Sequence, residues 1–133
     1  MVLVDTSVLI NYLKGVEDSY SSALQLLIDN KVPFGINPFI LQEILLGARS
    51  MKEYSILEKA LESLHLYQLK NEDSYKEAAK IMIKCRNSGV TLRNTIDCLI
   101  AQTAIENEVM LLCNDRDFTN MAGVIPELQL FEV

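Results

Sequence analysis

Hydrophobic and polar residues alternate along the chain between short apolar runs and longer segments with apolar residues every three or four positions. Short apolar runs are typical of buried strands, and the longer pattern is typical of helices. The predicted strands cover residues 2–4, 33–36, 66–69, 109–113 and 128–131. The predicted helices cover residues 7–13, 19–29, 38–47, 52–63, 72–87 and 95–107. This alternation favours an α/β fold.

The run from Val109 to Cys113 is apolar without interruption, which is typical of a parallel strand buried on both faces. No internal repeat, linker or low-complexity segment interrupts the chain. We therefore expect a parallel sheet with helices on both faces. In such sheets ligands bind beyond the carboxyl ends of the strands.

Composition narrows the class of protein further. The chain has 133 residues, half of them apolar and 23% charged, which fits one globular domain over residues 1–133. Its three cysteines are odd in number and widely spaced, so neither a disulfide framework nor a zinc ribbon is indicated. The N-terminus lacks a secretion signal, and no apolar run reaches the roughly 18 residues of a membrane span. We expect a soluble cytoplasmic protein with no membrane partner.

Acidic residues recur where the chain turns from strand to helix. Asp5 directly follows the first predicted strand, and Asp115 and Asp117 follow the strand at 109–113. Because parallel strands share one carboxyl edge, these turns belong to the same edge of the sheet. Asp97 falls in the first turn of its helix, and Glu43 on the second turn after Pro38. Both side chains can face that edge if their helices begin there.

A cluster of these carboxylates needs a counter-charge. At a separation of about 5 Å, each pair repels by roughly 3 kcal/mol at an effective dielectric constant near 20. Either the groups are protonated or a divalent cation lies among them. With one histidine, His65, and no paired cysteines, the ligands are hard oxygens, which suit Mg²⁺ or Mn²⁺ rather than zinc. Such an ion can activate a water molecule for attack on a phosphodiester.

Each acid also has a purely structural interpretation. Asp5 can cap the helix that begins near Ser7, although Thr6 and Ser7 already offer capping hydroxyls. Asn94 and Asp97 resemble a capping box. Glu43 can belong to an exposed polar stripe together with Gln42.

The structural alternative for the last two acids is a plain loop. In that interpretation Asp117 caps a short helix starting at Phe118, and Asp115 has no further role.

Four sequence segments identify a protein family when they occur together, although each alone is a weak signal. They are residues 3–10 (LVDTSVLI), 43–47 (EILLG), 95–101 (TIDCLIA) and 112–118 (LCNDRDF). In this order and over nearly the whole chain, they closely resemble the PIN-domain family. More narrowly, the chain is similar to the VapC-type toxin ribonucleases of bacterial and archaeal toxin–antitoxin pairs.

This resemblance implies a three-layer α/β/α sandwich around a parallel sheet of about five strands. It also implies a metal-dependent endoribonuclease with Mg²⁺ or Mn²⁺ as cofactor. The catalytic and metal-binding carboxylates would be Asp5, Glu43, Asp97 and Asp115, with Asp117 as an occasional further metal ligand. The implied partners are an RNA substrate such as tRNA, a small antitoxin that covers the active-site groove, and a second copy of the chain in a homodimer.

The chain departs from the family pattern at Cys113, where Ser or Thr usually lies two residues before the fourth acid. A thiol is a poorer hydrogen-bond partner than a hydroxyl, so we expect weaker orientation of a neighbouring carboxylate or water. Five basic residues near the acidic edge are candidates for phosphate contacts, although solvated surface charge is the simpler interpretation. They are Arg49, Lys52, Arg86, Arg93 and Arg116.

The net charge of −6 argues against a broad basic face for nucleic acid, unless part of it belongs to a cation site. Two other function classes stay open. One is an Mg²⁺-binding receiver-like or phosphatase-like domain, although Asp5 is followed by Thr6 and Ser7 rather than by a second acid. The other is a PIN-like interaction protein without catalysis. A dinucleotide-binding module is excluded because no glycine-rich turn follows the first strand.

Overall fold

Four short parallel strands form the sheet at the centre of the protein, in the order β3-β2-β1-β4. The computed structural model describes residues 1–133. The strands are β1 (Val2–Val4), β2 (Phe34–Ile36), β3 (His65–Leu66) and β4 (Met110–Leu112). In the register of the β1–β4 pair, Val4 of β1 lies opposite Leu112 of β4. The turns that follow these two strands therefore begin side by side.

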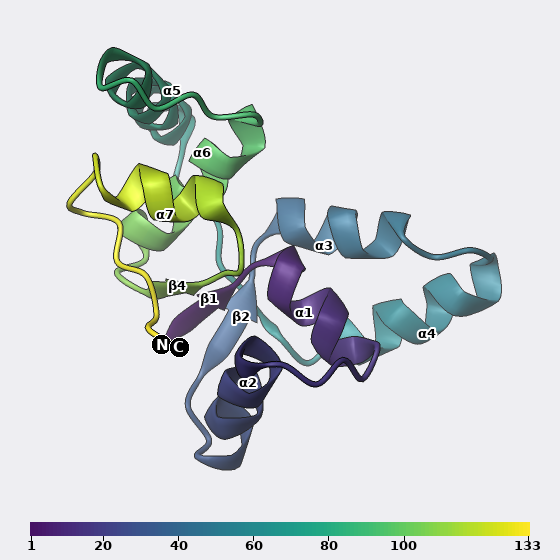
Figure 1. The fold of residues 1–133 in the computed structure, drawn as a ribbon. Coiled ribbons are helices and arrows are strands. Elements are labelled where there is room, and N and C mark those ends of the chain that lie inside the picture. The colour runs from purple at the N-terminus through teal and green to yellow at the C-terminus, as the bar shows by residue number, and fades with distance from the viewer.

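Two helices connect each strand to the next, and a seventh helix follows the last strand. The helices are α1 (Thr6–Leu13), α2 (Ser19–Asp29), α3 (Pro38–Leu46), α4 (Met51–Leu61), α5 (Glu72–Asn87), α6 (Thr95–Glu106) and α7 (Arg116–Ala122). Figure 1 shows α1 to α4 on one side of the strands and α5 to α7 on the other. This arrangement confirms the predicted α/β/α fold. None of the helices is long and apolar enough to cross a membrane.

The strands form the centre of the hydrophobic core, which contains 28 buried apolar residues. All three residues of β1 are at most 1% exposed, as expected for a parallel strand covered on both faces. Helix α6 is buried on more than one side, because consecutive residues from Ile100 to Ala104 are all buried. The position of this helix, and of Asp97 in its first turn, is thus fixed by packing.

The strand order places a crevice beside β1. From β1 the chain continues to β2 on one side, whereas β4 joins β1 on the other. Chain connections diverge at such a switch point, and the space beyond the carboxyl ends of the strands stays open there. Asp5 follows β1 and Asp115 follows β4, so both lie at this point.

The sheet has four strands rather than about five. The predicted strand at residues 128–131 forms only one bridge, between Leu111 and Leu130. Two backbone hydrogen bonds support it, from the Leu111 N–H to the Gln129 carbonyl and from the Phe131 N–H to the Leu111 carbonyl. The segment therefore adds a single bridge beside β4 rather than a fifth strand.

The close approach of β2 and β3 depends on Gly35. A Cβ atom at this position would overlap the backbone carbonyl of His65 on the neighbouring strand. Because a backbone atom cannot move aside as the end of a side chain can, we expect Gly35→Ala to lower the free energy of unfolding by about 1–3 kcal/mol. Urea denaturation measures this change.

Gly123→Ala is the matched control, since its Cβ would make only ordinary contact, 3.4 Å from the Asn120 carbonyl oxygen. An equal effect of the two substitutions would contradict the steric explanation.

Candidate active site

A polar cleft of about 380 Å³ opens beyond the carboxyl ends of β1 and β4. Nine residues line it, and none of them is hydrophobic. All five acids singled out from the sequence are among them, namely Asp5, Glu43, Asp97, Asp115 and Asp117. The structure thus brings together side chains that are up to 112 positions apart in the sequence.

Asp5 caps α1 and also lines the cleft. Its Oδ2 accepts hydrogen bonds from the Ser7 hydroxyl at 2.8 Å and from the Ser7 N–H at 3.3 Å. Asp5 rather than Thr6 or Ser7 is the capping residue, because the helix begins one residue earlier than predicted. The other carboxylate oxygen, Oδ1, has no protein partner. Burial raises the pKa of Asp5, with a smaller contribution from the charge of Glu43, against the hydrogen bonds from Ser7.

Asp115 likewise caps a helix, α7, and lines the cleft. Its Oδ1 accepts a hydrogen bond from the Asp117 N–H at 2.9 Å, so Asp115 is the cap and α7 begins at Arg116. The alternative in which Asp117 caps a helix starting at Phe118 is therefore wrong. The capping signal was present, but it belongs to the acid two positions earlier. Asp117 lies in the first turn and is only 7% exposed.

Ser7 connects the two turns that carry Asp5 and Asp115. Its hydroxyl donates to Asp5 and accepts a hydrogen bond from the Asn114 N–H at 3.1 Å. Beside it, the Asp5 N–H donates to the Leu112 carbonyl at 2.9 Å, which extends the β1–β4 ladder by one bond. These contacts hold the turn after β1 against the turn after β4.

Asp97 has no such partners. Asn94 caps α6 through the Ile96 N–H, so the capping box with Asp97 does not form. The Asp97 carboxylate makes no hydrogen bond or ion pair in the structure. Burial raises the pKa of Asp97 to about 7, and the charges of the other four acids of the cleft, Asp5 first, add to this rise.

Glu43 reaches the cleft from α3, and a buried cap fixes the start of this helix. The fully buried Asn37 accepts a hydrogen bond from the Ile40 N–H at 2.9 Å and donates to the Thr103 hydroxyl of α6 at 3.3 Å. This cap ties α3 to α6 and thus sets Glu43 relative to Asp97. Glu43 is half-buried, whereas its neighbour Gln42 is exposed, so the two do not form one exposed stripe.

Arg93 is the basic residue that lines the cleft. Its Nε donates to Asp117 Oδ2 at 3.0 Å, and one terminal nitrogen lies 3.6 Å from Asp115 Oδ1. The hydrogen bond to Asp117 and the charges of the nearby acids raise the pKa of Arg93. The sequence had suggested Arg93 as one of five candidates for phosphate contacts but not its ion pairs. The other four do not line the cleft.

The donors of the cleft suit a hard divalent cation, since they are carboxylates and hydroxyls. The Thr6 hydroxyl oxygen is buried beside the cleft with no protein partner, so it is available to a bound water molecule. With the side chains as they stand, no three acids converge closely enough to chelate an ion alone. A bound ion would therefore keep several water ligands, as Mg²⁺ usually does.

Cys113 lies at the end of β4, close to Asp5. Burial and the charge of Asp5 raise the pKa of its thiol to about 12, so the thiol is neutral at physiological pH. The Cys113 sulfur interacts with the backbone N–H of Asp115. The carboxylates of Asp5 and Asp115 are oriented by Ser7, by backbone N–H groups and by Arg93. The expected weakening at this position therefore does not extend to these two carboxylates.

The fold and this cleft define a class of protein. The family model of the PIN domain matches residues 2–124, so the chain belongs to the PIN domain family. This result confirms the resemblance noted from the sequence. It also removes the receiver-like and phosphatase-like alternative.

Individual relatives narrow the comparison. The chain is 28% identical over 125 residues to the VapC ribonuclease Mb1587 of Mycobacterium bovis and to the ribonuclease VapC11 of Mycobacterium tuberculosis, covering 93% of each sequence. Among solved structures, it matches VapBC2 from Rickettsia felis, bound to a promoter DNA fragment, with a TM-score of 0.74 and 23% identity over 98% of both chains. VapBC-1 from nontypeable Haemophilus influenzae matches with a TM-score of 0.73 and 18% identity, covering 99% of this chain and 98% of that one.

The raised pKa of Asp97 makes apo stability depend on pH. The pKa of Asp97 is higher in the folded state than in the unfolded state. Protonation of Asp97 therefore contributes fully to stability below about pH 4, and this contribution is lost as the pH rises through about 7. In EDTA at pH 8, we expect Asp97→Asn to raise the melting temperature by about 2–5 °C. The difference should shrink as the pH approaches 4.

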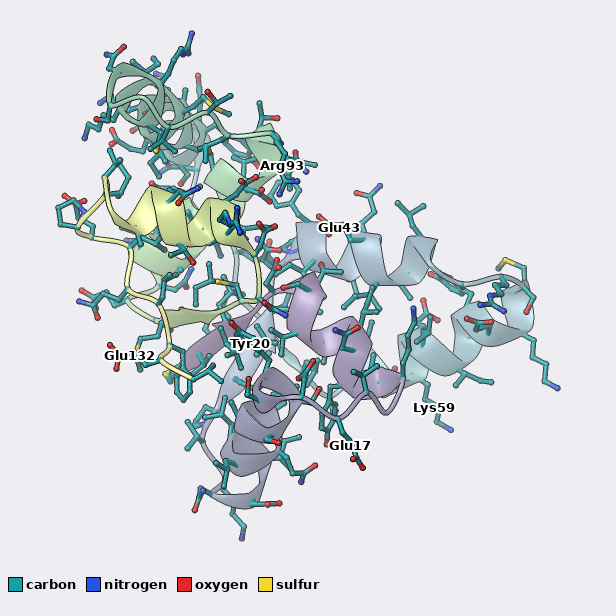
Figure 2. The ribbon with its side chains drawn as sticks, in the orientation of Figure 1. Glu17, Tyr20, Glu43, Lys59, Arg93 and Glu132 are labelled. Atoms are coloured by element: carbon teal, nitrogen blue, oxygen red, sulfur yellow. The ribbon has the colours of Figure 1, made fainter.

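Glu132→Gln is the charge-matched control, because this exposed residue near the C-terminus lies away from Glu43 and Arg93 in Figure 2. A melting temperature of Asp97→Asn equal to or below that of the wild type at pH 8 would show that Asp97 is not under repulsion.

Proposed function

We propose that this protein is an Mg²⁺- or Mn²⁺-dependent endoribonuclease and the toxin of a VapBC-type toxin–antitoxin pair. The observation that carries the proposal is the cleft in which five carboxylates meet, with Asp97 lacking any protein partner. Such a cluster is costly without a cation and suits a divalent one. The similarity to VapC ribonucleases favours RNA as the substrate.

The carboxylates that would hold the ion are Asp5, Glu43, Asp97 and Asp115, with Asp117 as a further contributor. Asp5 and Asp115 each use one oxygen for a helix cap and present the other without a protein partner. Asp97, held in place by the packing of α6, supplies an ionised carboxylate once a cation offsets the repulsion. When bound, the cation would lower the pKa of a water molecule and neutralise charge on the phosphate. No nucleophilic side chain is then needed.

The acidity of the chain is compatible with a nucleic-acid substrate because much of it is local. Five of the 18 acidic residues and one of the 12 basic residues line the cleft, which leaves 13 acids against 11 basic residues elsewhere. The cleft thus carries a net charge of −4 out of −6, and one divalent cation would halve it and reduce the repulsion of RNA where the substrate binds.

The partner of the pair would be a small antitoxin that binds over the cleft. Several matching structures are described as VapBC assemblies, which supports this part of the proposal. A homodimer is also proposed, and light scattering of the purified protein measures it. A non-catalytic interaction protein is the alternative, and no contact in the structure favours it.

Cleavage of RNA tests the activity. We expect purified protein to cut total cellular RNA into discrete fragments with Mg²⁺ or Mn²⁺ and not with EDTA. Asp5→Asn should abolish cleavage, because Asn keeps the helix cap but not the charge. Substituting groups that only support metal ligands costs about 10–100-fold. The loss of a ligand should lower the rate further.

Glu132→Gln serves as the control for purity and handling, since it removes one carboxylate away from the cleft. If wild type, Asp5→Asn and Glu132→Gln produce the same fragments, a contaminating nuclease is responsible and the proposal is wrong for that substrate pool.

The antitoxin has a separate test. A short reading frame should lie directly upstream of the gene, and its product should co-purify with this chain and suppress cleavage. A co-expressed product that neither binds nor inhibits would contradict the toxin–antitoxin part while leaving the nuclease intact.

A further inference from the structure

Arg93 neutralises only one side of the cleft. Its guanidinium contacts Asp117 at 3.0 Å and Asp115 at 3.6 Å. No basic side chain lies within 4.0 Å of the carboxylates of the other side. These are Asp5, Glu43 and Asp97, and we call them the open side; Asp115 and Asp117 form the arginine side. Asp115 borders both, since its Oδ2 has no protein partner.

The two sides differ in what holds them. On the arginine side, Asp117 is 7% exposed and its carboxylate receives the hydrogen bond from Arg93. The open side has no equivalent cation.

Arg93 itself is not a structural support of the fold. Its side chain is 76% exposed, and the two carboxylates are its only polar contacts in the structure. It belongs to the segment before α6 and reaches across to α7, and Figure 2 shows it near Glu43 at the cleft. The guanidinium thus has the position and the charge of a resident cation.

We propose that Arg93 takes the place of a second divalent cation, so that the cleft binds a single Mg²⁺ or Mn²⁺ ion, which the open side and Asp115 hold together with bound water molecules. This proposal rests on the metal centre of the proposed function. A divalent ion on the arginine side would have to displace the guanidinium from Asp117 and Asp115, and the positive charge of Arg93 would repel it. Arg93 is in this view a positioning residue that determines cation number.

Calorimetric titration of Mn²⁺ into full-length, EDTA-stripped protein at neutral pH tests the proposal. We expect the wild type to bind one ion and Arg93→Gln to bind two, because the carboxylates of the arginine side are then free. Arg93→Lys keeps the charge and should bind one ion. The double variant Arg93→Gln/Asp117→Asn should also return to one, since the second site has lost a ligand.

Counting bound Mn²⁺ by electron paramagnetic resonance provides an independent measurement of the same number. Two ions in the wild type, or one ion in Arg93→Gln, would overturn the proposal. If the wild type binds one ion and Asp5→Asn binds none, the metal centre of the proposed function stands even when Arg93→Gln gains no second ion. Absence of binding to the wild type and to every variant would overturn both the single-ion proposal and the metal dependence of the proposed function.

Discussion

The parallel pairing of β1 with β4 is the contact on which the cleft depends. Its register places Val4 opposite Leu112, and the hydrogen bond from the Asp5 N–H to Leu112 extends it into the following turn. The hydroxyl of Ser7 then joins this turn to Asn114. Two acids separated by more than a hundred positions are held at one edge because two short apolar strands are buried side by side.

Two of the cleft acids both cap a helix and line the cleft. Asp5 and Asp115 stabilise helix starts with one oxygen and face the cleft with the other. The helix caps offset part of the cost of bringing carboxylates together, because hydrogen bonds from N–H and O–H groups stabilise their ionised form. Asp97 has no such compensation, and burial together with the charges of the other cleft acids raises its pKa to about 7. The fold thus holds an arrangement that is unfavourable until a counter-charge is present.

The helices α3 and α6 and the segment before α6 position the remaining side chains of the cleft. Glu43 depends on the start of α3, which the buried Asn37 fixes and connects to Thr103 of α6. The same α6 is packed tightly by its own buried residues and carries Asp97. Arg93 reaches the cleft from the segment before α6 and is held by the acids alone. The fixed carboxylates and the exposed arginine therefore differ in how easily an incoming ion can move them.

The sequence by itself determined the α/β class and most element boundaries, because hydrophobic periodicity is a local signal, and its resemblance to a family singled out all five acids of the cleft. It did not determine the number of strands, since a single bridge at Leu130 depends on where the chain end packs. Nor did it show that Asp115 caps α7, that Asn94 and Asp97 form no capping box, or that Arg93 pairs with Asp117. Those outcomes depend on which groups meet across the sheet edge, and only the tertiary structure decides such distances.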